Sequence, residues 1–262
     1  MTAEDAKEHL FRSGDPDYMT SLARGLEVMH AFNGATSGLT MSEISVTTGL
    51  SRAVVRRCLY TLQELGYVRS NRDVYQLEPK VLSLSHDFVS SSSLYTIAQP
   101  YLEEVSEQTK ESCSLATLDG NDVVYVARAA TRRIMTVSLT VGSRLPSFCT
   151  SLGRVLLAYL DADARNDILE SIKIVSHTEH TVKTKRQLKQ VLAGVENDGY
   201  SIVSEELEIG LRSIAVPVFG RAGTVVAGMN VGAQAARVSE AQLLEHLPVL
   251  KRAAERLGVQ VT

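Results

Sequence analysis

Arginines gather in one short stretch of the chain, and a guanidinium can bind a phosphate oxygen or the edge of a base. Between Ser51 and Arg72 the sequence holds five arginines and a single acidic residue, Glu64, although the formal net charge of the chain is −3. A compact basic segment on a mildly acidic protein is typical of a local surface that binds nucleic acid. Basic runs are more often solvated surfaces, so this interpretation depends on the elements that carry the arginines.

The residues before and within this segment predict two short helices joined by a tight turn. Thr40 is followed three residues later by Glu43, the spacing of a capping box, so a helix should begin there. Gly49 can adopt the left-handed conformation that ends a helix. Ser51 is a good N-cap for the next helix, which we expect to end at Gly66. This order of helix, glycine turn and helix is the pattern of a helix-turn-helix.

Apolar residues mark the helix faces that we expect to form the core of this region. After Ser21, an earlier helix is predicted because Leu22, Leu26, Met29 and Phe32 recur at helical spacing. In the arginine-bearing helix the same spacing directs four residues inward, with Cys58 beside them: Val55, Leu59, Leu62 and Leu65.

The opposite face of the arginine-bearing helix carries Arg52, Arg56 and Tyr60, where a recognition helix meets the major groove. After Gly66, the run YVRSNRDVYQL predicts a β-hairpin with Arg69 and Arg72 at its tip, as a wing would have. The residues that we expect to contact DNA are Ser51, Arg52, Val54, Arg56, Arg57, Tyr60, Arg69 and Arg72. The alternative is a three-helix protein-interaction module whose arginines are only solvated.

Length and composition indicate an ordinary globular protein of two domains. The 262 residues are 22% charged and 44% hydrophobic, and no apolar run reaches the ~18 residues that a membrane span needs. Cys58, Cys113 and Cys149 are far apart and form no CxxC pair, which argues against a disulfide framework or structural zinc and fits a reducing cytoplasm. The acidic, polar start lacks the pattern of a secretory signal, so we expect residues 1–17 to be a frayed tail.

A helical connection to a larger second domain is predicted after Pro79, because Val81, Leu84 and Phe88 share helical spacing. An apolar helix that cannot bury its face alone often pairs with a partner chain, so we expect a homodimer. The expected boundaries are residues 18–79 for a winged helix-turn-helix, 80–95 for the linker helix and 96–262 for the second domain.

Beyond Glu111 the pattern changes to strands with a few helices between them. SLATLDGNDVVYVARA predicts two strands around an Asp-Gly turn, and further strands are expected at IMTVSLTV, YSIV, RSIAVPVF and TVVAGMNVG. Helices are expected from Thr150 to Leu160, from Lys185 to Asn197, and from Ser239 to about Leu257. The order predicts an α+β domain whose mainly antiparallel sheet is flanked by helices, and such a sheet commonly leaves a pocket on one face.

No combination of residues forms a recognised catalytic or metal-binding motif. GxSxG, GxxxxGK and GxGxxG patterns are absent from the sequence. His177 and His180 lie in a threonine-rich segment without a cysteine partner, which favours a surface loop over a metal site. Cys149 has no matched histidine and aspartate, so a nucleophile is not favoured either. We expect no enzyme activity, no cofactor and no metal.

The second domain also contains an acidic and a basic set of residues. We interpret the acidic set as part of a solvated loop that precedes a strand: Glu205, Glu206 and Glu208. One member of the basic set could pair with a ligand carboxylate, and the sequence does not choose among its members: Arg128, Arg132, Arg133 and Arg144.

Four segments together resemble the IclR-type transcription regulators, over essentially Ser21 to the C-terminus. They are SRAVVRRCLYTLQELGYV, LDGNDVVYVAR, VGSRLPSFCTSLGRVLLAYL and NDGYSIVSEELEIGLRSIAVPV. The form LPSFCTSLGRVLL is similar to the branch that regulates aromatic catabolism through the β-ketoadipate pathway. The resemblance implies a winged helix-turn-helix, a linker helix, a GAF-like effector domain, and assembly as dimers or tetramers.

The resemblance also implies where a small-molecule effector binds. Family contacts come from the start of the helix after the LP motif and from the central strands, which correspond here to Ser151, Leu152, Val203, Ser213, Asn230 and Gly232. The backbone amides of Ser151 and Leu152 could hold an anion. Apolar walls correspond to Ile134, Val137, Leu145 and Leu211. Val203, Asn230 and Gly232 depart from members that bind small keto acids, so an aromatic acid or a dicarboxylate is expected.

Together these observations predict a cytoplasmic, sequence-specific DNA-binding regulator. Its operator binding would be controlled by a small organic acid, an aromatic acid or a β-ketoadipate-pathway metabolite. One alternative is a small-molecule-binding enzyme or sensor with a helical interaction module, whose turnover would survive deletion of residues 1–83. Another is a constitutive DNA-binding protein with an empty second domain.

Overall fold

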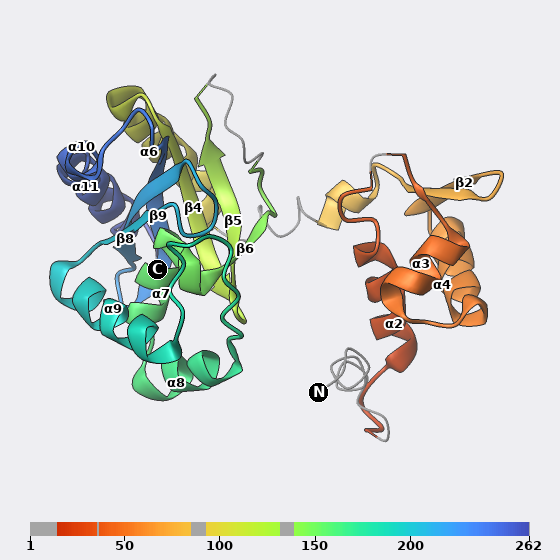
Figure 1. Ribbon diagram of the computed structural model, residues 1–262. Helices are drawn as coiled ribbons and strands as arrows, with labels where there is room; N and C mark the ends of the chain where they lie inside the picture. Colours follow the sequence, from red (N-terminus) through yellow and green to blue (C-terminus); the bar gives the residue numbers. More distant parts are fainter. Residues whose placement is uncertain (1–14, 36, 85–92, 132–138, 262) are drawn as a thin grey trace. The chain divides into compact units, whose positions relative to one another are not determined.

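The computed structural model describes residues 15–35, 37–84, 93–131 and 139–261 of the chain. It divides into two compact units, Met1–Phe88 and Val89–Thr262. Each unit has its own hydrophobic core. Figure 1 shows the helices and strands of both units.

The first unit is built on three helices, α2 (Thr20–His30), α3 (Met41–Thr48) and α4 (Arg52–Glu64). The predicted capping box at the start of α3 is confirmed, since the Thr40 hydroxyl accepts from the Glu43 amide and Glu43 accepts from the Thr40 amide. Gly49 ends α3 in the left-handed conformation, with φ of 71°. The turn into α4 is therefore short, as the sequence predicted.

A three-stranded antiparallel sheet completes the first unit, with strand order β1-β3-β2. Strands β2 (Val68–Asn71) and β3 (Val74–Leu77) form the predicted hairpin, and Arg72 lies in its turn. Strand β1 (Leu39–Thr40) pairs with β3 and was not predicted, because two residues are too few to show any periodicity.

Three apolar residues that were predicted to face the core of this unit are exposed instead. Leu22, Leu26 and Leu65 are 58%, 48% and 51% exposed. The helix α2 buries Val28 in their place, and α4 ends at Glu64, so Leu65 follows the last helical residue. The predicted inward positions Val55, Leu59 and Leu62 are buried, as is Phe32, which follows α2.

The second unit is organised around a six-stranded antiparallel sheet of order β6-β5-β4-β9-β8-β7. Its strands are β4 (Ser112–Asp119), β5 (Asp122–Ala129), β6 (Arg144–Pro146), β7 (Ser201–Ser204), β8 (Leu211–Phe219) and β9 (Val225–Gln234). Adjacent strands all pair antiparallel. The predicted α+β class is thereby confirmed.

Helices cover both faces of this sheet (Figure 1). On one face, α6 (Ser93–Thr109) and α11 (Leu247–Gly258) share a core with residues of β8 and β9 such as Val216 and Met229. On the other face, α7 (Ser151–Ala158) packs against β8 and β9, and α8 (Ala162–Ser171) and α9 (Lys185–Asp198) enclose a second core with it. The alternation along each strand sends successive side chains to these two cores.

Several predicted boundaries in the second unit need correction. The single helix predicted after Ser239 is two helices, α10 (Glu240–Glu245) and α11, because Pro248 starts a new helix. The strand expected at 134–141 lies mostly outside the described residues, and 139–141 are not strand. Helix α8 and strand β6 were not predicted. Residues 81–84 are helical, but most of the predicted linker at 80–95 lies outside the described residues, and Leu94 is buried in the core of the second unit.

The residues that the structure describes include no helix that combines the length and the apolar character required to span a membrane.

Gly153 allows α7 to begin directly against the preceding segment. A Cβ built at Gly153 would lie 2.1 Å from the Ser147 carbonyl oxygen and 2.3 Å from the Ser147 Cα, both backbone atoms that cannot swing away. We expect Gly153→Ala to lower the free energy of unfolding of the second unit by about 1–3 kcal/mol or more, as overpacking does. Differential scanning calorimetry measures the change.

The matched control is Gly194→Ala in α9, where an added Cβ would meet nothing within 4 Å. This variant should leave stability unchanged or raise it by up to about 1 kcal/mol, because alanine is the better helix former. Equal stability of the two variants would contradict the close approach at Gly153.

Candidate functional site

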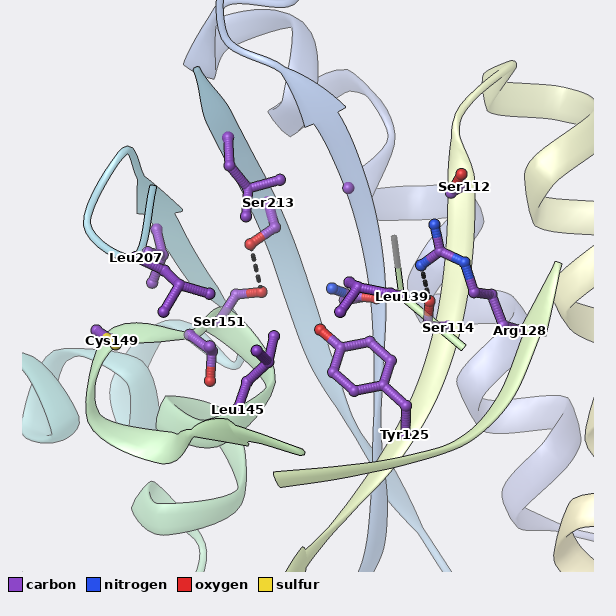
Figure 2. Close-up of a pocket in the computed structure, with 15 residues that line it drawn as sticks. Ser112, Ser114, Tyr125, Arg128, Leu139, Leu145, Cys149, Ser151, Leu207 and Ser213 are labelled. Carbon is purple, nitrogen blue, oxygen red and sulfur yellow. Dashed lines mark hydrogen bonds between the residues drawn. The ribbon is translucent and has the colours of Figure 1, made fainter. Parts of the chain in front are cut away.

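A pocket lies on the α7 side of the second unit's sheet, near the start of that helix (Figure 2). The empty space between its lining residues is about 510 Å³, a volume that includes open solvent at its mouth. The residues that line it are Ser112, Ser114, Tyr125, Arg128, Leu139, Leu145, Cys149, Thr150, Ser151, Val203, Leu207, Leu211, Ser213, Asn230 and Gly232.

The strand register explains how the pocket floor is assembled. In one row across the sheet, Ser114 pairs with Arg128 on β5 and with Asn230 on β9. In the next row, Gly232 on β9 lies between Ser112 on β4 and Ser213 on β8. Residues two apart on a strand point to the same face, so the two rows form one polar floor.

Gly232 has no side chain, so the space above this part of the floor is empty. A Cβ built at Gly232 would meet no atom within 4 Å, although the residue lines the pocket. A larger residue at this position would therefore extend into the cavity.

A β-bulge places two further side chains at the pocket. The register of β4 with β5 shifts between Leu115 and Ala116, so Ala116 pairs with Tyr125 while Leu115 pairs with Ala127. Strand β5 therefore has one residue more than its partner, and Tyr125 and Arg128 face the same side although they are three apart. Figure 2 shows both side chains rising from β5 into the site.

Burial controls the protonation of two lining groups. Burial raises the pKa of Tyr125 to about 12, against a smaller opposing effect of the Arg128 charge. Burial also raises the pKa of Cys149 to about 12, with the Glu206 charge acting in the same direction. Both groups are neutral near pH 7, and a protonated thiol is a poor nucleophile, so Cys149 acts as a wall residue.

The start of α7 closes one side of the pocket. Thr150 caps the helix, its hydroxyl accepting from the Gly153 amide at 3.2 Å. The Ser151 hydroxyl lies 2.8 Å from that of Ser213 on β8, which ties the helix to the sheet (Figure 2). The walls on this side are thus partly polar and already hydrogen-bonded.

A buried ion pair fastens the loop after β7 to α7. Arg154 is 3% exposed, and its Nη2 lies 2.6 Å from Glu206 Oε2. The same carboxylate oxygen accepts from the Val182 amide at 3.1 Å, and the Arg154 Nε donates to the Phe148 carbonyl. Leu207, next to Glu206, lines the pocket. The interpretation of Glu206 as part of a solvated acidic loop was therefore wrong.

Most of the residues expected from sequence to contact an effector meet around this one cavity. Those that line it are Leu145, Ser151, Val203, Leu211, Ser213, Asn230 and Gly232. Leu152 does not line it; this residue is fully buried below and packs over Gly228. Ile134 and Val137 lie outside the described residues.

Other lining residues were not among the predicted effector contacts: Ser112, Ser114, Tyr125, Leu139, Cys149, Thr150 and Leu207. Of the four arginines between which the sequence did not choose, Arg128 lines the pocket. Arg144 is paired with Asp119 and Asp122 on the surface, and Arg132 and Arg133 lie outside the described residues. Alternating patterning would have found Ser112 and Ser114 once Asn230 was chosen, but the bulge that turns Tyr125 inward has no sequence signal.

The surface of α4 presents most of its predicted DNA-contacting residues to solvent: Ser51, Arg52, Arg56, Arg57 and Tyr60. Arg52 donates to the Ser42 hydroxyl on α3 at 2.8 Å. Among the described residues, no carboxylate pairs with an arginine of α4. Val54 differs from the rest, because it is half-buried and packs against the core of the first unit.

The hairpin β2–β3 carries the other two predicted contacts. Arg72 lies in the turn with φ of 57°, as predicted. Arg69 is the second residue of β2 and pairs with Gln76, so its predicted place at the tip of the hairpin was wrong. The Arg69 Nε is 3.2 Å from a Glu78 carboxylate oxygen in an exposed ion pair, which a phosphate could replace at little cost.

The His177 and His180 pair shows no metal-binding arrangement. No group of three or more histidine, cysteine or acidic side chains with the geometry of a metal site exists in the part of the chain that the structure describes. The His177 ring stacks on Phe148 with a centroid distance of 6.0 Å. The loop from 176 to 182 instead holds the Glu206 segment through hydrogen bonds of Thr178 and Thr181.

Comparison with known families gives two matches. Residues 21–72 match the IclR helix-turn-helix domain, and residues 86–259 match the C-terminal domain of the bacterial transcriptional regulator IclR. The chain is also similar to the Pca regulon regulatory protein of Pseudomonas putida, with 44% identity over all of this chain and 90% of the relative.

Solved structures agree with these matches. A protein from Rhodococcus sp. RHA1 has 43% identity and a TM-score of 0.80, covering 92% of this chain and 97% of its own. The inducer-binding domain of the transcription factor PobR from Acinetobacter, a double mutant in complex with 3-hydroxybenzoic acid, has 32% identity and a TM-score of 0.60. It covers 63% of this chain and 98% of its own.

The Arg154–Glu206 pair generates a stability prediction. Arg154→Met leaves the Glu206 carboxylate buried without its cation, so we expect a loss of about 3–5 kcal/mol in the free energy of unfolding. Adding Glu206→Leu should recover much of that loss, since both charges are then gone. Calorimetry of the two variants measures the difference.

Arg256→Met is the control, because the ion pair of Arg256 with Glu104 is exposed and should contribute about 1 kcal/mol or less. If Arg154→Met costs no more than this control, the pair does not fasten the loop.

Proposed function

The chain belongs to the IclR family of bacterial transcription regulators, and from this premise we propose how it binds DNA and which effector class it senses. Helix α4 enters the major groove of an operator, and the β2–β3 hairpin contacts the adjacent backbone. A small aromatic acid, or another acid of the β-ketoadipate pathway, occupies the pocket of the second unit and changes operator affinity. Because its target is the chromosome of a bacterium, we place the protein in the cytoplasm.

The observation that supports DNA binding most directly is the free cationic side of α4. Arg52, Arg56 and Tyr60 are exposed, and among the described residues no carboxylate neutralises the arginines of this helix. Arginine side chains on a recognition helix can bind guanine edges or phosphates, the two contacts that give specificity and affinity. A basic face without a protein counter-charge is open to bind phosphates.

The effector class is supported by the relatives and by the pocket. A regulator similar over the full chain is described for the Pca regulon, and a domain at 32% identity has been crystallised with 3-hydroxybenzoic acid. The pocket here combines apolar walls such as Leu145 and Leu211 with a polar floor that includes Arg128. A flat ring with a carboxylate fits this combination.

Self-association is part of the proposal, since a pseudo-palindromic operator needs two copies of α4. The first unit exposes apolar side chains that a second copy could cover: Met19, Leu22, Leu26, Leu65, Leu82 and Leu84. Light scattering should give at least a dimer at micromolar concentration, and a monomer there would contradict this part of the proposal.

Operator binding depends on α4 in this account. Arg56→Ala should weaken binding by about 1–3 kcal/mol if the side chain reads a base, and an electrophoretic mobility shift or anisotropy titration measures it. Arg186→Ala, an exposed arginine on α9 of the second unit, is the control and should bind as the wild type does. Unchanged affinity of the triple variant Arg52→Ala, Arg56→Ala and Arg57→Ala would remove α4 from the interface.

Effector binding is tested by thermal unfolding of the full chain. A ligand that binds only the folded protein should add about 2.7 kcal/mol of stability at 100 times its dissociation constant. We expect 3-hydroxybenzoate, 4-hydroxybenzoate or β-ketoadipate to do so and to alter operator affinity. A protein that binds its operator while none of these acids shifts its unfolding would be a constitutive regulator.

A further inference from the structure

Arg128 is the one charged residue among the described residues that line the pocket, and none of the others carries a charge to balance it. Its Nη1 donates to the Ser114 hydroxyl at 3.1 Å, and no carboxylate of the described residues lies within ion-pair distance. Burial lowers the pKa of the Arg128 guanidinium, which is the effect of removing a charge from water without compensation. A guanidinium has five N–H donors, so most of its hydrogen-bonding capacity is unused.

Two other arginines of this unit have a carboxylate partner, which Arg128 lacks. Arg154 is more deeply buried, and Glu206 balances its charge at 2.6 Å. Arg237 likewise pairs with the buried carboxylate of Glu111. Among the described residues, Arg212 is half-buried without a carboxylate too, but it donates to Ser204 and to the Val238 carbonyl, whereas Arg128 donates only to Ser114. A partly buried charge with so few partners points to a ligand carboxylate as its counter-ion.

Asn230 is the second unsatisfied group, and it lies in the same row of the sheet. The residue is 7% exposed, and its Oδ1 is buried without a hydrogen-bond partner. Its neighbour in that row is Ser114, which is also the residue that Arg128 contacts. An acceptor left unpaired in a buried site costs about 1–3 kcal/mol, which a donor on the ligand would recover.

The hydroxyls on the far side of the pocket do not have this deficit. The hydroxyls of Ser151 and Ser213 bond to each other. In the pocket, the guanidinium of Arg128 therefore lacks an anion to balance its charge, and the amide oxygen of Asn230 lacks a hydrogen-bond donor.

We propose that Arg128 binds the carboxylate of the effector and that Asn230 Oδ1 accepts a hydrogen bond from a hydroxyl on the same molecule. The effector is then a hydroxy acid, and these two residues select it. The inference rests on the proposed function, since it names the chemistry of the ligand in that same pocket. It places the anion at Arg128 on β5, across the floor from the amides at the start of α7 that could also hold one.

The test is isothermal titration of the full-length wild type and of Arg128→Gln with 4-hydroxybenzoate and 4-hydroxybenzamide. The wild type should bind the acid more tightly than the amide. Arg128→Gln should bind the acid at least roughly 30-fold more weakly than the wild type, because a buried charge pair is broken, and should no longer prefer it over the amide. Arg256→Gln, on α11 at the opposite face of the sheet, is the control and should bind as the wild type does.

The hydroxyl is tested on the wild type alone, so that folding of a variant is not in question. Benzoate and 4-methoxybenzoate should each bind roughly 10-fold more weakly than 4-hydroxybenzoate, because neither can donate to Asn230. Equal affinity for 4-methoxybenzoate would overturn the role of Asn230, and tight binding of the acid by Arg128→Gln would overturn that of Arg128. Both results would leave the pocket as the effector site, whereas a wild type that binds none of these acids would reject the proposed effector class as well.

Discussion

The unpaired charge of Arg128 is the constraint on which the second unit's function depends. Beside the pocket, the α7 side of the sheet holds an apolar core, where Leu152, Val155 and Leu157 are fully buried. A guanidinium can be held half out of water beside such a core only if something compensates its lost hydration. The neighbouring serine supplies one hydrogen bond, and a carboxylate from outside the chain supplies the rest. The unfavourable free energy of partly dehydrating the Arg128 guanidinium is thus recovered when the effector binds.

The backbone makes this arrangement possible. The bulge in β5 turns Tyr125 and Arg128 to one face of the sheet. Two glycines without side chains allow α7 to pack closely beside the cavity. A Cβ at Gly228 would lie 3.0 Å from Leu152, and one at Gly153 would collide with Ser147. Gly232 has the opposite role, because the space above it is empty. Glycine therefore allows close packing of α7 at Gly153 and Gly228, and it leaves room for a ligand at Gly232.

The sequence predicted the elements whose signals are local. The Thr40–Glu43 capping box and Gly49 located α3, the Asp-Gly turn located β4 and β5, and Ser239 located the start of α10. The family resemblance correctly predicted seven of the residues that line the pocket. The failures have physical causes: Leu22 and Leu26 lie on a helix face that looks apolar but is exposed, since Val28 occupies the core. A bulge, a two-residue strand and a missing counter-ion are products of tertiary structure, so the inward side chain of Tyr125 and the unpaired charge of Arg128 could not be read from spacing.

The most direct test of this account is a crystal structure of the full chain with 4-hydroxybenzoate. The account predicts the carboxylate within hydrogen-bonding distance of the Arg128 guanidinium and the ring hydroxyl at Asn230. A carboxylate bound instead at the amides of Ser151 and Leu152, with Arg128 turned to solvent or paired with an acidic side chain of the protein, would contradict it.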